Sequence, residues 1–265
     1  IWKFITLAYI PPTIAGIVLA YRGRLLAGGI LTAFFIALQI MSNHVQMSYY
    51  FLFVILFIAG AYFEDAWRNK TLPGFFKASA VLLVAALIGV AANLSNLYHT
   101  YTYSKETMRG KSELVQTGNA AKQTSSGLDR DYITNWSYGI GETWTLLVPN
   151  FKGGSSAAPL SQSETAMEKA NPMYGSLYNS FPQYFGSQPW TAGPVYVGAF
   201  VLFLFVLGCF IVKGPLKWAL LGATFFSIVL AWGKNFMPLT DFFIDYIPMY
   251  NKFRAVSSIL VIAAV

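Results

Sequence analysis

The chain has 265 residues, a formal net charge of +7, and a composition that is 55% hydrophobic and only 11% charged. Its apolar residues come in runs of about seventeen to twenty, long enough to cross ~30 Å of hydrocarbon as helices, which excludes an ordinary soluble domain. The basic residues are dispersed among short connections, which argues against a nucleic-acid partner. Cys209 is the only cysteine, so the chain has neither a disulfide framework nor a thiolate metal site of its own.

Four apolar runs in residues 1–97 predict the first four transmembrane helices. They are Phe4–Ala20, Leu25–Met41, Met47–Phe63 and Phe75–Leu97. Pro11 and Pro12 predict a kink in the first helix, because each proline removes a backbone donor. Small residues in the second and fourth runs predict closely packed helix faces. These are Gly28, Gly29, Ala78, Ala85, Gly89 and Ala92.

The rest of the chain divides into a polar loop domain and a second membrane part. Residues 98–193 are polar but rich in aromatic residues, which indicates an ordered domain outside the membrane. In residues 194–265 we expect two spans, a loop, and the start of a third span near Ala255. The two spans are Pro194–Val212 and Leu216–Trp232, and the loop, 233–254, carries an interfacial helix at Leu239–Tyr246. The predicted fold is an all-α polytopic membrane protein with about seven transmembrane helices.

The basic residues predict which connections face the cytoplasm. They gather in the first, third and fifth connections, as Arg22, Arg24, Arg68, Lys70, Lys77, Lys213 and Lys217. Because such residues stay on the cytoplasmic side, the His44 turn, the long segment 98–193 and the loop 233–254 should share the opposite side. The polar chemistry is therefore expected at one extracytoplasmic face.

Two candidate polar sites are predicted from single stretches. His44 and Gln46 form the turn between the second and third helices, where they could bind a substrate or an anionic headgroup, or simply cap two helices. Glu142 lies among glycines and aromatic residues, where partial desolvation could suit it to general-base catalysis. Alternatively, Glu142 is a carboxylate at a helix start, favoured by the helix dipole.

Two further stretches carry charged candidates. Asp129 and Asp131 could hold a divalent cation through oxygen ligands, or form part of a solvated loop. Lys252 and Arg254 stand where the last outer loop re-enters the membrane, and could bind a lipid-linked phosphate or snorkel to the headgroups. Asp241 and Asp245 share one helical face, which indicates a solvated surface.

Three stretches resemble the YfhO-type bacterial membrane proteins. They are QIMSNHVQMSYY (Gln39–Tyr50), WSYGIGETWTLLVPNFKGG (Trp136–Gly154) and the Phe253–Arg254 re-entry, and they follow one another in the same order. The long outer loop looks like that of members from the Bacteroidetes group. The YfhO-type proteins in turn resemble multispanning C-type glycosyltransferases. This resemblance implies a multi-pass protein of the bacterial inner membrane with an extracytoplasmic active face.

The resemblance also implies an activity and roles for the candidate residues. A sugar would pass from a polyprenyl-phosphate carrier to an envelope polysaccharide or lipid acceptor. Glu142, or an acid outside this chain, would be the base, while His44, Lys252 and Arg254 would meet the phosphate. Sugars would stack on the aromatic residues of the loop domain. These are Trp136, Tyr138 and Trp144.

Two other functions remain open at this point. A lipid or glycolipid transporter would explain a broken helix at Pro11 and Pro12, although the span interiors lack the ionisable residues typical of a substrate pathway. A non-catalytic envelope-assembly protein would need no site. Because the chain begins at Ile1 without Met and ends at Val265 within an apolar run, we expect it to be part of a longer protein.

Overall fold

A computed structural model describes residues 2–107, 127–193 and 195–264. The regular elements in these ranges are helices, and the β-structure there amounts to one isolated bridge between Pro159 and Pro182. The expected all-α class is therefore confirmed. The chain forms two compact units. Unit 1 comprises Ile1–Leu128, Val212–Ser227 and Ile259–Val265, and unit 2 comprises Asp129–Ile211 and Ile228–Ser258.

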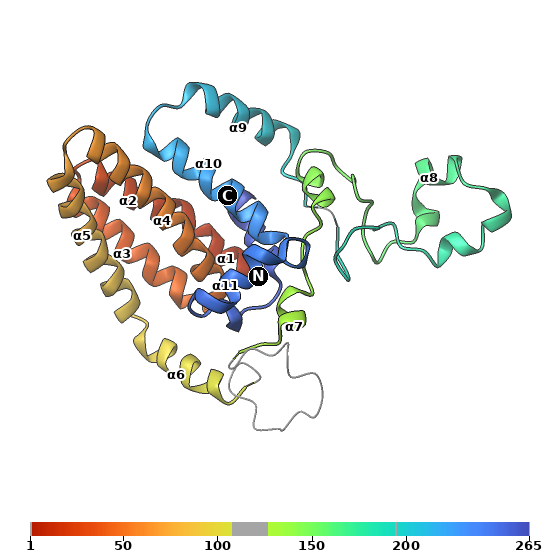
Figure 1. Ribbon diagram of the computed structural model, residues 1–265, viewed down its shortest axis with the longest axis horizontal. Coiled ribbons are helices and arrows are strands. Elements are labelled where there is room, and N and C mark those ends of the chain that lie inside the picture. The colour runs from red at the N-terminus through yellow and green to blue at the C-terminus, as the bar shows by residue number, and fades with distance from the viewer. Residues whose placement is uncertain (1, 108–126, 194, 265) are drawn as a thin grey trace. The chain divides into compact units, whose positions relative to one another are not determined.

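Unit 1 consists of helices, of which α6 is polar and the others are largely apolar (Figure 1). Its N-terminal helices are α1 (Trp2–Ala8), α2 (Ile10–Tyr21), α3 (Leu25–Met41), α4 (Val45–Arg68), α5 (Leu72–Ala91) and α6 (Leu94–Lys105). The helix α10 (Pro215–Ala231) begins in unit 1 and ends in unit 2. Tyr9 separates α1 from α2, and Pro11 and Pro12 lie in the first turn of α2, where no backbone donor is needed. Because Lys3–Tyr21 still counts as one apolar helix long enough to cross a membrane, the kink at the prolines stays a prediction.

Small residues bring three of these helices into close contact. A Cβ atom on Gly28 of α3 would lie 2.7 Å from the carbonyl oxygen of Gly16 in α2, so only glycine allows this approach. A Cβ on Gly89 of α5 would lie 2.8 Å from the carbonyl oxygen of Ala33 in α3. The predicted packing at Gly28 and Gly89 is therefore confirmed, whereas Ala92 is exposed at the end of α5.

The bundle of unit 1 is polar in parts of its interior and apolar on its outside. Thr6 and Ser42 are buried and share a hydrogen bond of 2.5 Å. On α3, by contrast, Leu26, Ile30 and Phe34 are exposed at four-residue spacing. Apolar stripes of this kind are unfavourable in water and are typical of helices that face lipid.

Three helices are long and apolar enough to cross a membrane. They are Lys3–Tyr21, Val45–Arg68 and Leu72–Ala91, and a fourth span results if Pro215–Ala231 and its bent continuation to Tyr246 are counted as one. The helices α3 and α9 (Ala199–Ile211) are apolar but shorter. Near Ala255, the expected start of a seventh span, the chain forms two short elements, η8 (Val256–Leu260) and α12 (Val261–Ala264). The described residues thus support three or four of the seven predicted spans.

Unit 2 is built from short helices joined by ordered loops. Besides α9, its elements are α7 (Arg130–Thr134), η2 (Gly141–Leu146), η3 (Leu160–Gln162), α8 (Glu164–Glu168), η4 (Pro172–Tyr174), η5 (Leu177–Asn179), η6 (Gly233–Phe236), α11 (Met237–Tyr246) and η7 (Tyr250–Lys252). The expected helix at Leu239–Tyr246 is confirmed by α11. The predicted division of the chain at residues 98 and 194 concerns sidedness and stays a prediction.

Candidate functional site

Glu142 is buried in unit 2, with 3% of its surface exposed. It lies in the first turn of η2. A carboxylate in this position loses the hydration that an ionised group needs, so it must find hydrogen-bond donors within the protein.

Three donors surround the Glu142 carboxylate. The Gly139 N–H donates to Oε2 at 2.5 Å, and the Ser187 N–H donates to the same oxygen at 3.2 Å. The hydroxyl of Tyr184 donates to Oε1, while its own oxygen accepts from the Gln188 N–H at 2.8 Å. The carboxylate therefore joins the loop before η2 to the segment 184–188, which is distant in sequence.

Two glycines make room for this carboxylate. A Cβ atom on Gly186 would lie 2.3 Å from both Glu142 Oε1 and Tyr184 Oη. A Cβ on Gly139 would lie 2.8 Å from Glu142 Oε2. Real Cβ atoms do not approach oxygen so closely, so both positions require glycine for the carboxylate to be held in this way.

A small pocket lies beside Glu142, with free space of about 10 Å³, roughly enough for one water molecule. The polar side chains at its wall include Tyr138, Glu142, Thr145, Lys152, Tyr184 and Gln188. Tyr138 and Thr145 are buried. The Thr145 side chain is the hydrogen-bonding neighbour of the Tyr138 hydroxyl. A buried hydroxyl at a pocket wall is a candidate ligand contact.

The pocket tyrosines are neutral hydrogen-bond donors at physiological pH. Burial, reinforced by the charge of Glu142, raises the pKa of Tyr138 to about 12. Burial and the hydrogen bond to Glu142 also raise the pKa of Tyr184 well above its usual value. The one fixed negative charge among the pocket groups named above is therefore that of Glu142.

Lys152 supplies a positive charge to the same pocket. Its Cε would lie 3.3 Å from a Cβ atom on Gly141, and its Nζ stands 5.5 Å from the centre of the Phe185 ring. The sequence interpretation missed both Lys152 and Tyr184. The Gly-rich context drew attention to Glu142, but no local signal in the sequence reports a partner that is forty-two positions away.

The end of α10 and the residues that follow it form hydrogen bonds with residues 138 and 143, on either side of Glu142. The Tyr138 N–H donates to the Ala231 carbonyl at 2.8 Å, and Asn235 Nδ2 donates to the Tyr138 carbonyl at 2.9 Å. Trp232 Nε1 donates to Thr143 Oγ1 at 3.0 Å. These bonds fix the backbone on both sides of Glu142, so its position does not depend on side-chain packing alone.

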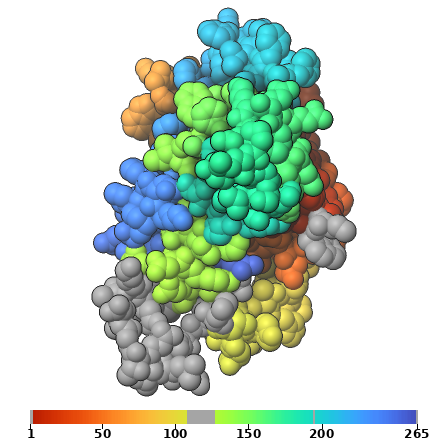
Figure 2. All heavy atoms as spheres, turned by 90° about the vertical axis from the view of Figure 1, so that its right-hand side faces the viewer, coloured from red at the N-terminus to blue at the C-terminus, as the bar shows by residue number. Residues whose placement is uncertain are grey.

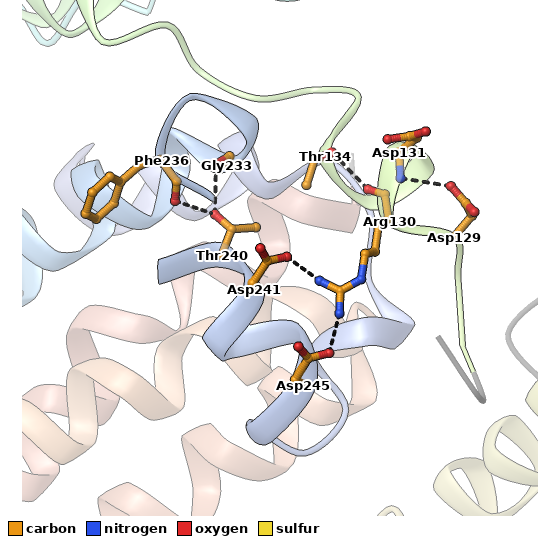
Figure 3. A network of polar contacts seen from close by, with 9 residues as sticks. All are labelled: Asp129, Arg130, Asp131, Thr134, Gly233, Phe236, Thr240, Asp241 and Asp245. Atoms are coloured by element: carbon orange, nitrogen blue, oxygen red, sulfur yellow. Dashed lines mark hydrogen bonds and ion pairs between the residues drawn. The ribbon is translucent and has the colours of Figure 1, made fainter. Parts of the chain in front are cut away.

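Arg130 forms an ion-pair network with the helix α11 (Figure 3). Its Nη1 contacts Asp241 and its Nη2 lies 2.5 Å from Asp245. The two aspartates share one face of α11, as predicted, but they bind a guanidinium and are not merely a solvated surface. The pairing holds α7 against α11.

The predicted cation ligands Asp129 and Asp131 lie at the start of α7. Asp129 is the N-cap, and its Oδ1 accepts from the Asp131 N–H at 2.8 Å. Helix capping accounts for one of the two carboxylate oxygens of Asp129. Among the described residues no group of three or more His, Cys, Asp or Glu side chains is placed to hold a metal. That Asp129 and Asp131 bind a divalent cation stays a prediction.

The remaining candidates of unit 2 are distributed over several positions. Trp136 Nε1 donates to the Trp190 carbonyl at 3.2 Å, whereas Trp144 is exposed and its ring centre lies 6.5 Å from that of Phe151. Arg254 Nη1 donates to the Tyr132 hydroxyl at 2.7 Å. Lys252 ends η7. Of the predicted site residues, the structure thus brings Tyr138 and Glu142 together in the pocket.

His44 and Gln46 belong to unit 1, at the start of α4. Gln46 Nε2 donates to the Tyr50 hydroxyl at 3.0 Å. Burial, with a contribution from the charge of Lys3, lowers the pKa of His44 below its usual 6.5, so the imidazole is neutral at pH 7. A phosphate would therefore meet a hydrogen-bonding group here and not a cation. That His44 and Glu142 share one site stays a prediction.

The turn at His44 also carries buried polar atoms without hydrogen-bond partners among the described residues. They are Gln39 Nε2, His44 Nδ1 and Ser48 Oγ. Unpaired buried polar atoms are uncommon in folded proteins, so the His44 turn is still a candidate site for binding a polar ligand.

No known protein family matches the sequence, and neither a curated protein nor a solved structure is significantly similar to it.

Proposed function

We propose that the chain belongs to a multispanning membrane glycosyltransferase-like protein that moves a sugar from a polyprenyl-phosphate carrier to a cell-envelope acceptor. One observation carries the proposal: the buried Glu142 carboxylate shares a pocket with the Lys152 ammonium and the Tyr138 hydroxyl. A base, a cation and a hydroxyl donor are groups that assist transfer from a phosphate leaving group.

In the proposed reaction, the acceptor hydroxyl attacks the anomeric carbon of the carrier-bound sugar. Its proton passes to Glu142, the bond between the anomeric carbon and the phosphate oxygen breaks, and the polyprenyl phosphate leaves with the electron pair. Lys152 stabilises the negative charge on that phosphate. The Tyr138 hydroxyl and Thr145 orient a sugar hydroxyl at the pocket wall.

The hydrogen bonds on Glu142 leave room for this role. A carboxylate has about four acceptor positions, and the bonds from Gly139, Ser187 and Tyr184 occupy three of them. One position remains for an acceptor hydroxyl.

The finer membrane arrangement is part of the same proposal. Seven spans, with Arg22, Arg68 and Lys213 in cytoplasmic connections, would put residues 98–193 on the outer side of a bacterial inner membrane. His44, Lys252 and Arg254 would then contact the carrier phosphate, Trp136 and Trp144 would contact the sugars, and a cation at Asp129 and Asp131 would assist. The exposed apolar stripes on the helices support the membrane part of this arrangement.

A non-catalytic envelope-assembly protein is the second candidate function. The three hydrogen bonds on Glu142 favour it, because they give the carboxylate a purely structural task of joining two loops. The two functions differ in one respect, since only the transferase consumes a lipid-linked sugar.

The test is an extract of membranes that contain the complete protein, supplied with a panel of polyprenyl-phosphate sugars. We expect loss of one carrier-bound sugar and the appearance of a glycosylated acceptor, both abolished by Lys152→Met. The matched control is Lys169→Met, which removes an exposed lysine of the same unit. If no lipid-linked sugar is consumed under any condition, the transferase is rejected and the assembly protein is favoured.

A further inference from the structure

Residues 140–151, in and around η2, carry a row of exposed apolar side chains. Its members have between 40% and 56% of their surface exposed and are spaced one to four residues apart. They are Ile140, Trp144, Leu147, Val148 and Phe151, which we call the η2 stripe. The opposite side of the same segment holds Glu142 and Thr145, which are buried at the pocket. The segment is therefore amphipathic, with its apolar side directed away from the protein.

The helix α9 of the same unit is apolar on all sides. None of its residues is buried, and its exposed large side chains include Phe200, Phe203 and Phe210. Figure 2 shows the side chains of α9, in cyan, uncovered on the face in view. A helix that is hydrophobic all round is stable only inside a protein core or in lipid. Since unit 2 provides no core for α9, lipid is its natural surrounding.

A backbone hydrogen bond connects η2 to the entrance of α9. The Val197 N–H donates to the Leu146 carbonyl at 3.3 Å, and α9 begins at Ala199. The stripe thus lies next to the point where the chain enters its apolar helix. At such a boundary between headgroups and hydrocarbon, Trp and other aromatic side chains are the favoured residues.

We propose that the η2 stripe lies in the membrane interface, with Trp144, Val148 and Phe151 inserted among the lipids. This docking needs no sugar transfer and stands apart from the proposed function. Lys152 follows the stripe directly, and its ammonium is suited to anionic headgroups. Because Lys152 also lines the Glu142 pocket, the pocket opens at the depth of the lipid headgroups.

A fluorescence experiment on the complete protein in lipid vesicles tests this docking. After Cys209→Ala, single cysteines are introduced as Val148→Cys and Met173→Cys, and each is labelled with an environment-sensitive fluorophore. Met173 is the matched control, because it is apolar and 79% exposed but lies outside the stripe. Circular dichroism checks that both labelled proteins are folded.

Nitroxide-bearing lipids should quench the label at 148 strongly and the label at 173 weakly. Aqueous iodide should quench position 148 at least about threefold less than position 173, as expected for a side chain below the headgroups. Two results would overturn the proposal. Equal iodide quenching at both positions would show that the stripe faces water, and protection of position 148 from both quenchers would show that protein covers it.

Discussion

The Tyr184 hydroxyl donates a hydrogen bond to the Glu142 carboxylate from forty-two positions further along the chain. This bond closes the pocket on one side, and it holds the carboxylate in an orientation that also suits the Gly139 and Ser187 amides. We expect the stability of the site to depend on this contact.

Replacement of Tyr184 by Phe should lower the free energy of unfolding by about 2 kcal/mol, because a hydrogen bond to a buried charged group is lost. The midpoint of thermal unfolding in detergent measures the effect. Tyr178→Phe is the control, since its hydroxyl donates only to the exposed Asn171 carbonyl at 3.2 Å. Equal midpoints for the two variants would show that the Tyr184 bond contributes nothing.

Replacement of Gly186 by Ala should disrupt the pocket and cost about 2 kcal/mol, because overpacking forces buried groups to move. The new Cβ would lie 2.3 Å from two oxygen atoms, Glu142 Oε1 and Tyr184 Oη. Gly193→Ala is the matched control, since its Cβ would meet nothing within 4 Å. The measurement is again thermal unfolding, and a larger loss in the control variant would contradict the geometry.

Alkaline pH should destabilise the protein through the pocket tyrosines. The pKa of Tyr138 is raised from 10.0 to about 12, so the folded state holds its proton more tightly than the unfolded state. The resulting stability is fully present below pH 10 and is lost as pH rises toward 12. Tyr138→Phe should remove part of that slope, measured by denaturant unfolding from pH 9 to 12.

A spectroscopic titration supplies the control for this prediction. The phenolate absorbance of the native protein, compared with that of Tyr138→Phe, should show no ionisation of Tyr138 near pH 10. Ionisation at the ordinary pKa of a tyrosine would show that the side chain is solvated and would remove the basis of the argument.

The Arg130 network should make a modest, salt-sensitive contribution to stability. Arg130→Met leaves Asp241 and Asp245 unpaired, and we expect a loss of about 1 kcal/mol at low salt because all three groups are partly exposed. The loss should shrink in 1 M salt. Arg68→Met is the control, since the Arg68–Glu64 pair is well exposed and should matter less.

The bundle of unit 1 could largely be predicted from the sequence. Uninterrupted apolar runs indicate apolar helices directly, and the run Leu25–Met41 coincides with α3, although α3 is shorter than the three candidate spans. Glycine positions such as Gly28 and Gly89 predicted close packing, because a residue without a side chain lets another helix approach closely, whichever helix that is. Both signals can be read from one stretch of sequence, so they predict the helices and their close-packed faces without knowledge of the tertiary fold.

The site was only half predictable for the opposite reason. Glu142 and Tyr138 were predicted from a local context of glycines and aromatic residues, and both line one pocket. Tyr184 is distant in sequence from Glu142, and Asp241 and Asp245 are distant from Arg130. The neighbouring residues in the sequence give no indication of these contacts. Such pairings follow from the tertiary fold and not from sequence spacing.

The most direct test of the account is the rate of sugar transfer by the complete protein when Glu142 is replaced by Gln. The amide can keep the shape of the site, because its oxygen can accept from Gly139 and Ser187 while Tyr184 accepts from its NH₂ group. We predict a folded variant in which transfer from polyprenyl phosphate falls at least about 100-fold, as loss of a general base requires. A folded variant that transfers sugar at the wild-type rate would contradict the assignment of Glu142 as the base.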